Sequence, residues 1–363
     1  MKILNISLDK KVLDKNSAVA KRILDYEKLV DKYTIISLDS GKGKLANFLN
    51  IYSEAKKILK QERYDVITVQ DAYFVGWLAV KLARKFKAGL EVQAHGFEKF
   101  NFIRKTISKY VLTNVDSIRV VSQRLREKLI MEFKVDAGKI TVVPVYTEVG
   151  STKSEVPARN AALYLHSVAG ERSNDNNNFI FLTVGRLVPV KNIGMQIAAL
   201  KNTVETRHGA SEKIVKLWII GDGSQRRNLE LRVKKLGLEN NIEFLGWQNN
   251  LNEFYQKADA FLLTSNSEGW GMAVVEAAQF GLPIIMTDVG LAGEVIKDGE
   301  SGIIIPVGDQ KALETAMIRI IENEDLRKKL GAGALKEVKK LPTKEQTIKK
   351  MISSWQKAIH LVK

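Results

Sequence analysis

Two short stretches in the second half of the chain carry residues suited to binding a phosphate-bearing ligand. The first closes an apolar run with Gly185-Arg186 and reaches Lys191-Asn192, where a helical pattern opens. Arg forms forked hydrogen bonds with phosphate oxygens, Lys supplies a point charge, and a helix N-terminus adds free N–H groups. This combination suits a diphosphate, although this motif alone also fits two exposed surface cations on a turn.

The second stretch places two carboxylates on either side of a glycine-rich turn into a helix. Glu268 precedes the turn, and Glu276 lies about two turns along the helix, among apolar neighbours that leave it in need of a polar partner. Gly269 and Gly271 let the backbone approach a phosphate closely, and the helix start near Met272 supplies N–H donors. Carboxylates repel phosphates but accept hydrogen bonds from sugar hydroxyls. We therefore expect phosphates at the helix start and sugar hydroxyls at the two glutamates.

Both stretches need a parallel sheet to position them. Short apolar runs alternate with amphipathic stretches, which predicts strands separated by helices. The strands predicted in the second half are Phe179–Val184, Val215–Ile220, Ile242–Leu245, Ala260–Thr264, Pro283–Met286 and Gly302–Ile305. Open α/β sheets bind ligands at the carboxyl ends of their strands, and both motifs directly follow a predicted strand.

The first half repeats the alternation and contributes one further candidate. Its predicted strands are Lys2–Ser7, Tyr33–Leu38, Asp65–Gln70, Leu90–Ala94, Ser117–Val121 and Ile140–Val143. His95 follows the fourth of these strands, where a functional role is favoured over the structural role that a lone histidine more often has.

The length of 363 residues exceeds the usual size of a single hydrophobic core. We predict an α/β protein with two Rossmann-like doubly wound domains facing a central cleft. The predicted divisions are an N-terminal domain at 1–150, a polar linker at 151–178, a C-terminal ligand-binding domain at 179–342 and a terminal helix at 343–363 that packs back on the N-terminal domain. The chain has no cysteine, which excludes disulfides, thiolate metal sites and thiol nucleophiles.

The order of motifs resembles the family-4 retaining glycosyltransferases, which have the GT-B fold. The resemblance runs from about Phe179 to Asp309 and includes, besides the two stretches above, Gly221-Asp222-Gly223, Phe244-Leu245-Gly246, Gly281-Leu282-Pro283 and Glu294 to Gly299. The N-terminal half matches more loosely. The Gly-Gly loop that family members often have after the first strand is replaced by Asp14-Lys15-Asn16-Ser17-Ala18.

The resemblance implies roles for individual residues. Arg186 and Lys191 resemble the cations that hold the donor diphosphate, and Gly269, Gly271 and Met272 the segment that binds it through backbone N–H groups. Glu268 is similar to the glutamate that contacts the transferred sugar, Glu276 to the one that binds the ribose, and Gly246 belongs to the segment that borders the base. His95 resembles the cleft histidine near the donor sugar and the acceptor, and the expected catalytic set is His95, Glu268, Arg186 and Lys191.

The predicted reaction is transfer of a hexose or hexose derivative from a nucleotide-diphosphate sugar, with retention at the anomeric carbon. The expected acceptor is a glycan or lipid-linked molecule, as in cell-envelope polysaccharide synthesis. We expect no cofactor, because the donor, with UDP or GDP as its nucleotide, is a substrate. No Asp-x-Asp occurs in the sequence, so we also expect no metal, with Arg186 and Lys191 neutralising the diphosphate.

The net charge of +16 is unevenly distributed. Residues 1–150 carry 28 Lys and Arg against 17 Asp and Glu, which leaves +11 in this part. Together with Phe and Ile residues among the cations of Lys99–Tyr110, this charge suggests contact with an anionic membrane surface, although a core-packed helix with a solvated basic face fits equally well. The first residues are too short an apolar run for a signal peptide, so we expect a cytoplasmic protein, peripheral at the inner face of the membrane.

Three other functions remain open at this level. A nucleotide-sugar epimerase shares the architecture and would turn over donor without an acceptor. A nucleic-acid-binding protein would explain the charge, but the cations are spread over several predicted helices without an aromatic or zinc motif, so we expect no nucleic-acid partner. An inactive scaffold of the same fold would not need the intact set of Arg186, Lys191, Glu268 and Glu276.

Overall fold

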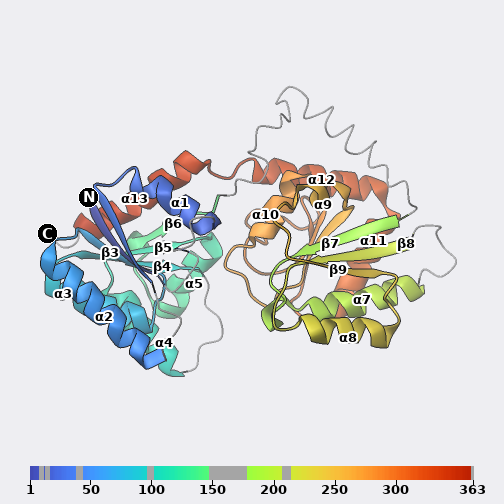
Figure 1. The fold of residues 1–363 in the computed structure, drawn as a ribbon. Coiled ribbons are helices and arrows are strands. Elements are labelled where there is room, and N and C mark those ends of the chain that lie inside the picture. Colours follow the sequence, from blue (N-terminus) through green and yellow to red (C-terminus); the bar gives the residue numbers. More distant parts are fainter. Residues whose placement is uncertain are drawn as a thin grey trace. The chain divides into compact units, whose positions relative to one another are not determined.

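The protein divides into two compact units. The computed structural model describes residues 1–7, 12, 17–37, 44–95, 102–146, 178–206 and 214–360. Unit 1 combines Met1–Val145 with Pro342–Lys363, and unit 2 spans Tyr146–Leu341. The chain therefore returns to unit 1 after unit 2 is complete (Figure 1).

Unit 1 is built on a parallel six-stranded sheet with the order β2-β1-β3-β4-β5-β6. The inner strands are almost wholly buried, as expected for apolar runs covered by helices on both faces. The order reverses between β1 and β3, which makes that point the switch point of the sheet. The strands are β1 (Lys2–Ser7), β2 (Lys32–Ser37), β3 (Val66–Val69), β4 (Gly89–Ala94), β5 (Ser117–Val120) and β6 (Ile140–Val142).

Helices α1 and α13 lie on one face of this sheet, and α2, α3 and α4 lie on the other (Figure 1). Ser17 and Ser122 cap α1 and α5 by accepting a hydrogen bond from a backbone N–H of the first turn, as serine commonly does at a helix start. The helices of unit 1 are α1 (Ala18–Glu27), α2 (Lys44–Gln61), α3 (Phe74–Phe86), α4 (Phe102–Asn114), α5 (Gln123–Phe133) and α13 (Lys344–His360).

The C-terminal helix α13 is anchored in unit 1 by a buried carboxylate. Glu91 is fully buried on β4, and its Oε2 accepts hydrogen bonds from Trp355 Nε1 at 3.0 Å and Thr68 Oγ1 at 2.6 Å. Arg119 on β5 forms an ion pair with the other carboxylate oxygen at 3.5 Å. The fully buried Trp355 ring packs beside Ile3, so α13 supplies part of the core of unit 1.

Unit 2 is also built on a parallel six-stranded sheet, with the order β12-β11-β10-β7-β8-β9. Its switch point lies between β7 and β10, which are neighbours in the sheet although far apart in the chain. The strands are β7 (Asn178–Val184), β8 (Ile214–Ile220), β9 (Ile242–Gly246), β10 (Ala260–Leu263), β11 (Ile284–Thr287) and β12 (Ile303–Ile305).

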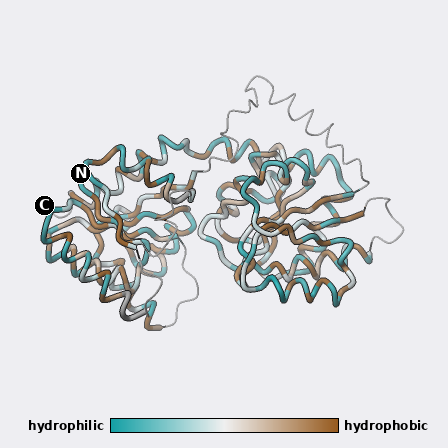
Figure 2. The backbone as a smooth tube through the Cα atoms, viewed as in Figure 1, coloured by the Kyte–Doolittle hydropathy of each residue, from teal (hydrophilic) through white to brown (hydrophobic). Residues whose placement is uncertain are grey.

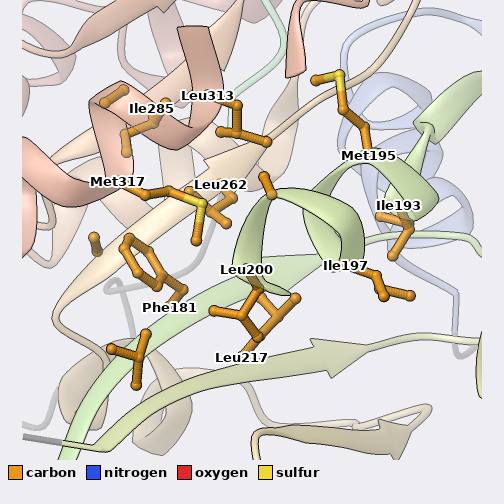
Figure 3. Packing of buried hydrophobic residues seen from close by; sticks show 14 of the residues in the cluster. Phe181, Ile193, Met195, Ile197, Leu200, Leu217, Leu262, Ile285, Leu313 and Met317 are labelled. Carbon is orange, nitrogen blue, oxygen red and sulfur yellow. The ribbon is translucent and has the colours of Figure 1, made fainter. Parts of the chain in front are cut away.

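Helices α7, α8 and α11 cover one face of the second sheet, and α9, α10 and α12 cover the other (Figure 1). Figure 3 shows Leu200 and Ile197 of α7 beside Leu217 of β8, with Met317 of α11 next to Phe181. In both units the strands are the hydrophobic part of the chain and the outer helices are mixed (Figure 2). The helices are α7 (Ile193–Thr206), α8 (Arg226–Leu236), α9 (Asn252–Lys257), α10 (Met272–Gln279), α11 (Gln310–Glu322) and α12 (Glu324–Val338).

The predicted α/β class is confirmed. Each of the twelve predicted strands corresponds to an observed strand, with bounds that differ by one residue at most. Residues 147–177, which include almost all of the predicted linker, lie outside the described residues. The terminal helix predicted at 343–363 corresponds to α13, which contacts β4, β5 and β6 of unit 1.

We predict that Trp355→Phe destabilises unit 1. The substitution keeps an aromatic ring but removes the N–H that Glu91 accepts, and a lost hydrogen bond to a buried charged group costs about 1.5–3 kcal/mol. Chemical denaturation followed by far-ultraviolet circular dichroism measures the effect, because the substitution itself removes one of the two tryptophans of unit 1. Gln356→Ala, at an exposed position of the same helix, is the control and should change the free energy of unfolding by less than about 0.5 kcal/mol. Equal stability of both variants would contradict the anchoring role of Glu91.

Candidate functional site

The switch point of unit 2 brings the two sequence motifs together. Arg186 and Lys191 follow β7, and Glu268 follows β10, so their loops leave adjacent strands at the same edge of the sheet. Asn266 N donates a hydrogen bond to Val190 O at 2.7 Å, which joins the two loops directly. Residues 77 positions apart in the chain therefore share one site.

Lys191 and Glu268 form an ion pair in this structure. Lys191 Nζ donates to Glu268 Oε1, and Ser265 Oγ donates to the same oxygen at 2.6 Å. Arg186 is exposed and has no ionic partner among the described residues. The two predicted cations thus differ, since one is already paired and the other is open to a ligand.

A buried polar pair holds the loop that carries Lys191. Thr264 Oγ1 lies 3.2 Å from both Lys191 O and Asn192 O and accepts a hydrogen bond from Gln196 Nε2 at 2.8 Å. Thr264 and Gln196 are almost fully buried. Asn192 adopts a left-handed backbone with a φ of 49°, a conformation that asparagine tolerates better than most residues. The position of Lys191 is therefore fixed from its backbone.

The glycine-rich turn leads into α10 with the geometry that the sequence suggests. Gly271 precedes the helix at a φ of 105°, which disfavours any residue with a Cβ, and no side chain caps the helix start. The N–H groups of Met272 and Ala273 therefore have no intrahelical acceptor, whereas Val274 N already donates to Gly271 O at 2.9 Å. Leu291 N donates to Trp270 O at 2.9 Å and holds the turn, which also includes Gly269, from the other side.

Glu276 has the polar partner that its apolar surroundings require. Tyr255 OH, on α9, donates to Glu276 Oε2 at 2.9 Å, and the Tyr255 ring stacks on Phe280. Burial raises the pKa of Glu276 above its usual value, and the Tyr255 hydrogen bond partly opposes this rise. Glu276 is therefore a partly buried, oriented acceptor and not an ordinary surface residue.

The ends of β8 and β9 border the same edge. Gly221 packs so closely against Gly185 O that a Cβ would collide with it, and Leu187 N donates to Asp222 O at 2.8 Å. Gly246 O, at the end of β9, accepts a hydrogen bond from Gly221 N at 2.7 Å. These contacts hold the predicted base-side segment next to the loop after β7.

An exposed aromatic and a paired cation flank this base-side segment. The Trp247 side chain, directly after β9, is 66% exposed. The Arg226 guanidinium lies 6.0 Å from the centre of the Phe244 ring and is ion-paired with Glu230 at 2.8 Å. An exposed indole provides a flat surface on which a planar ligand group can stack.

The remaining predicted residue, His95, belongs to unit 1. It directly follows β4 at the carboxyl edge of that sheet, and its side chain is accessible to solvent. Neighbouring protein atoms displace part of the water around the imidazole, and this desolvation lowers the pKa of His95. The positive charges of Arg119 and Arg22 lower it further. The imidazole is therefore neutral near pH 7 and can donate or accept a hydrogen bond.

Asp71 is a second titratable group at this edge of unit 1 and was not predicted. It follows β3 and is buried, which raises its pKa to about 6 despite a hydrogen bond from Tyr73 N. Nearby, Ser7 Oγ donates to Gln70 Oε1 at 3.1 Å across the switch point of unit 1. A buried aspartate before a helix gives no distinctive sequence signal, because the same pattern is typical of a helix N-cap.

Four supporting residues of unit 2 also escaped sequence reasoning: Gln196, Tyr255, Thr264 and Ser265. Thr264 and Ser265 directly precede the second motif, so their positions in the sequence could have indicated a place in the site, although their residue types alone could not. Gln196 and Tyr255 lie within helices and become neighbours of the site only through the fold.

No group of three or more His, Cys, Asp or Glu side chains in the described ranges is arranged to hold a metal ion. No helix in the same part of the chain combines the length and apolar character needed to cross a bilayer.

Comparison with protein families accounts for both units. The profile described as Glycosyl transferases group 1 matches residues 169–337, and the profile described as Glycosyltransferase Family 4 matches residues 24–145. The chain is a family-4 glycosyltransferase. The sequence resemblance is therefore confirmed, and in this glycosyltransferase the motif residues of unit 2 lie within the range of the first profile.

Individual relatives agree with this assignment. An uncharacterized glycosyltransferase of Methanocaldococcus jannaschii is 28% identical over 302 residues, covering 82% of this chain and 76% of the relative. The UDP-Gal:alpha-D-GlcNAc-diphosphoundecaprenol alpha-1,3-galactosyltransferase of Escherichia coli is 25% identical over 283 residues, covering 74% of this chain and 70% of that enzyme.

Solved structures confirm the GT-B fold of this glycosyltransferase. HepE of Anabaena, in complex with UDP and glucose, superposes with a TM-score of 0.76 at 17% identity and covers 98% of this chain and 99% of its own. Sucrose-phosphate synthase of Thermosynechococcus elongatus gives a TM-score of 0.76 at 19% identity, with 98% of each chain covered. At these identities the likeness concerns the fold alone.

We predict that the Tyr255–Glu276 hydrogen bond stabilises unit 2 in a pH-dependent way. Because the folded pKa of Glu276 is raised, its ionisation costs stability, and this cost appears as the pH rises from the unfolded value through the folded one. Tyr255→Phe removes the donor that opposes this cost. It should therefore lower the free energy of unfolding by about 1–3 kcal/mol near neutral pH and by less in acid.

Urea denaturation at about pH 8 and about pH 4.5 checks this prediction, with Tyr110→Phe at an exposed position of α4 as the control. Glu276→Gln should have the opposite effect and stabilise unit 2 at neutral pH, since it removes the carboxylate that must ionise. A pH-independent loss in Tyr255→Phe would show that the hydroxyl acts through packing and not through the carboxylate.

Proposed function

We propose that this glycosyltransferase transfers a hexose, or a hexose derivative, from a nucleotide-diphosphate sugar to a glycan or lipid-linked acceptor. The observation that carries the proposal is the convergence of Arg186, Lys191 and Glu268 at the switch point of unit 2. The loop after β7 supplies both cations, and one of them, Lys191, contacts the carboxylate that suits sugar hydroxyls. Nucleotide binding at such a point is a general property of doubly wound sheets.

Each group of the donor has a candidate partner at this edge. Arg186, Lys191 and the N–H groups of Met272 and Ala273 suit the diphosphate, because they combine positive charge with free donors. Glu276 suits the ribose hydroxyls, since its carboxylate is oriented by Tyr255. The segment that ends with Gly246 and the exposed Trp247 suits the base.

The chemistry would depend on stabilising the departing nucleotide. As the bond between the anomeric carbon and the diphosphate lengthens, negative charge develops on the phosphate oxygens, where Arg186 and Lys191 neutralise it. We propose retention at the anomeric carbon, with the acceptor attacking from the face that the diphosphate leaves, and no covalent sugar-enzyme intermediate. We assign neutral His95 to the acceptor side as a hydrogen-bonding group.

The relatives indicate the class of donor and acceptor. The Escherichia coli relative is named for transfer of galactose from UDP-Gal to a diphosphoundecaprenol-linked sugar. A Staphylococcus aureus relative, 26% identical over 240 residues, is named for capsular polysaccharide biosynthesis. These names support a UDP-sugar donor and a lipid-linked acceptor in cell-envelope polysaccharide synthesis, with GDP as the other nucleotide that the sequence leaves open.

We predict that the donor binds without a metal ion. A panel of UDP, GDP, ADP and their sugars, measured by thermal shift in EDTA and again with magnesium or manganese, should identify one nucleotide that stabilises the protein equally in each buffer. Arg186→Ala should weaken its binding by about tenfold, since charge-assisted hydrogen bonds contribute about 1.5–3 kcal/mol. Lys311→Ala, on α11, is the control.

A strict requirement for either ion would disprove metal independence. Turnover of donor without acceptor, with formation of an epimeric sugar, would favour the epimerase. Binding of no nucleotide in the panel would contradict the proposed function itself.

The basic face of unit 1 supports a further proposal, that the enzyme works at the cytoplasmic face of a membrane. Helix α4 carries three cations and no acidic residue, and its Phe102, Ile103 and Tyr110 side chains are 85%, 63% and 40% exposed. Its inward side is formed by buried Ser108, Val111 and Leu112, so the exposed apolar groups are not needed for the core. Residues 99–101 of the predicted interfacial segment lie outside the described residues.

The neighbouring helix α3 extends this surface. It packs beside α4, bears Lys81, Arg84 and Lys85 without any acidic residue, and exposes Phe74. Exposed aromatic groups among cations suit the interface of an anionic bilayer, where rings enter the headgroup region and cations meet lipid phosphates. A lipid-linked acceptor would be found in the same bilayer.

We predict binding to anionic vesicles through α4. The protein should sediment with vesicles that contain phosphatidylglycerol and not with pure phosphatidylcholine, and the double variant Phe102→Ser with Ile103→Ser should bind about tenfold more weakly, because it loses apolar insertion. Leu231→Ser, at a leucine that is 58% exposed on the basic helix α8, is the control. Equal binding to both kinds of vesicle, or to neither, would refute this location.

A further inference from the structure

The ion pair with Glu268 engages Lys191, the cation that we assign to the donor diphosphate. The two side chains are only 20% and 13% exposed, so water and salt screen their attraction weakly. Lys191 Nζ contacts Glu268 Oε1, whereas Oε2 has no partner among the described residues. A diphosphate that takes Lys191 therefore competes with a carboxylate of this protein.

Ser265 holds the carboxylate in place whether or not Lys191 stays. Its Oγ donates to Glu268 Oε1 at 2.6 Å, and the residue is 1% exposed, two positions after the end of β10. Thr287 Oγ1 donates to Ser265 O at 2.7 Å and fixes the backbone there. Glu268 thus remains partly buried and pointed at the site when Lys191 turns to a phosphate.

We infer that Glu268 makes the site discriminate between the nucleotide-sugar donor and the nucleoside diphosphate that remains after transfer, while Ser265 holds the carboxylate in place with either ligand. Either ligand draws Lys191 away and leaves a partly buried carboxylate near negative phosphates, which is unfavourable. The sugar hydroxyls of a donor replace the lost interaction by donating to Glu268. The nucleoside diphosphate lacks the transferred sugar and therefore the hydroxyls that would donate to Glu268. Its binding keeps the full cost of breaking the Lys191–Glu268 ion pair, and the product leaves readily.

This inference rests on the proposed function and gives Ser265 a specific part in it. Ser265 is a positioning residue, because it acts on the ligand only through Glu268. Without the serine hydroxyl, the carboxylate would lose its last donor once Lys191 leaves. Nucleoside diphosphate binding would then become still less favourable.

Calorimetry with UDP and UDP-glucose, and with GDP and GDP-mannose, tests the inference on the full-length protein. E268Q should bind the nucleoside diphosphate about tenfold more tightly than the wild type, because the amide releases Lys191, and should bind the nucleotide sugar no more tightly. The preference for donor over product therefore falls. E239Q removes one negative charge at an exposed position before β9, at the opposite edge of the sheet, and should change neither affinity.

Two double variants separate the mechanism from its alternatives. In a K191M background, E268Q should no longer improve nucleoside diphosphate binding, because no lysine remains to be released. S265A should weaken nucleoside diphosphate binding, and adding E268Q should abolish that loss, whereas a general folding defect would persist.

Unchanged or weaker nucleoside diphosphate binding by E268Q would overturn the inference while leaving the proposed function intact. A tenfold gain that persists in K191M would mean direct repulsion of the phosphates by Glu268 and would overturn the exchange of Lys191. If neither wild type nor E268Q binds any nucleotide, the proposed function fails as well.

Discussion

The adjacency of β7 and β10 is the constraint on which the site of unit 2 depends. The chain leaves β7, builds the sheet outward through β8 and β9, and returns through α9 to place β10 on the other side of β7. The loop after β7 leads to one face of the sheet, and the loop after β10 leads to the other. Both loops begin at the carboxyl ends of neighbouring strands, so side chains near their starts can meet there. Lys191 from one loop and Glu268 from the other then lie within hydrogen-bonding distance.

Polar contacts then fix what the topology brings near. Buried Thr264 and Gln196 hold the backbone carbonyls of Lys191 and Asn192, and Asn266 is joined to Val190. Such bonds are strong in a buried setting, where an unpaired polar group would be costly. The site is therefore rigid in its backbone and adjustable in its charged side chains.

The strands and the positions of the motifs could be predicted because their signals are local. A strand buried on both faces is a short apolar run, and Gly271 and Gly221 occur where the backbone turns or approaches another segment closely. The pairing of side chains could not be predicted. Lys191 meets Glu268, Tyr255 meets Glu276 and Glu91 meets Trp355 across 77, 21 and 264 residues, and nothing within one segment specifies the partner.

The position of α13 has a consequence for the order in which the chain folds. This helix covers β4, β5 and β6 and contributes Trp355 to the core of unit 1, yet it is synthesised after every residue of unit 2. During translation, all strands of unit 2 have been synthesised before α13 is available to cover the sheet of unit 1. Until then, buried Glu91 lacks its indole partner, and an apolar face of the first sheet is open to solvent and to chaperones.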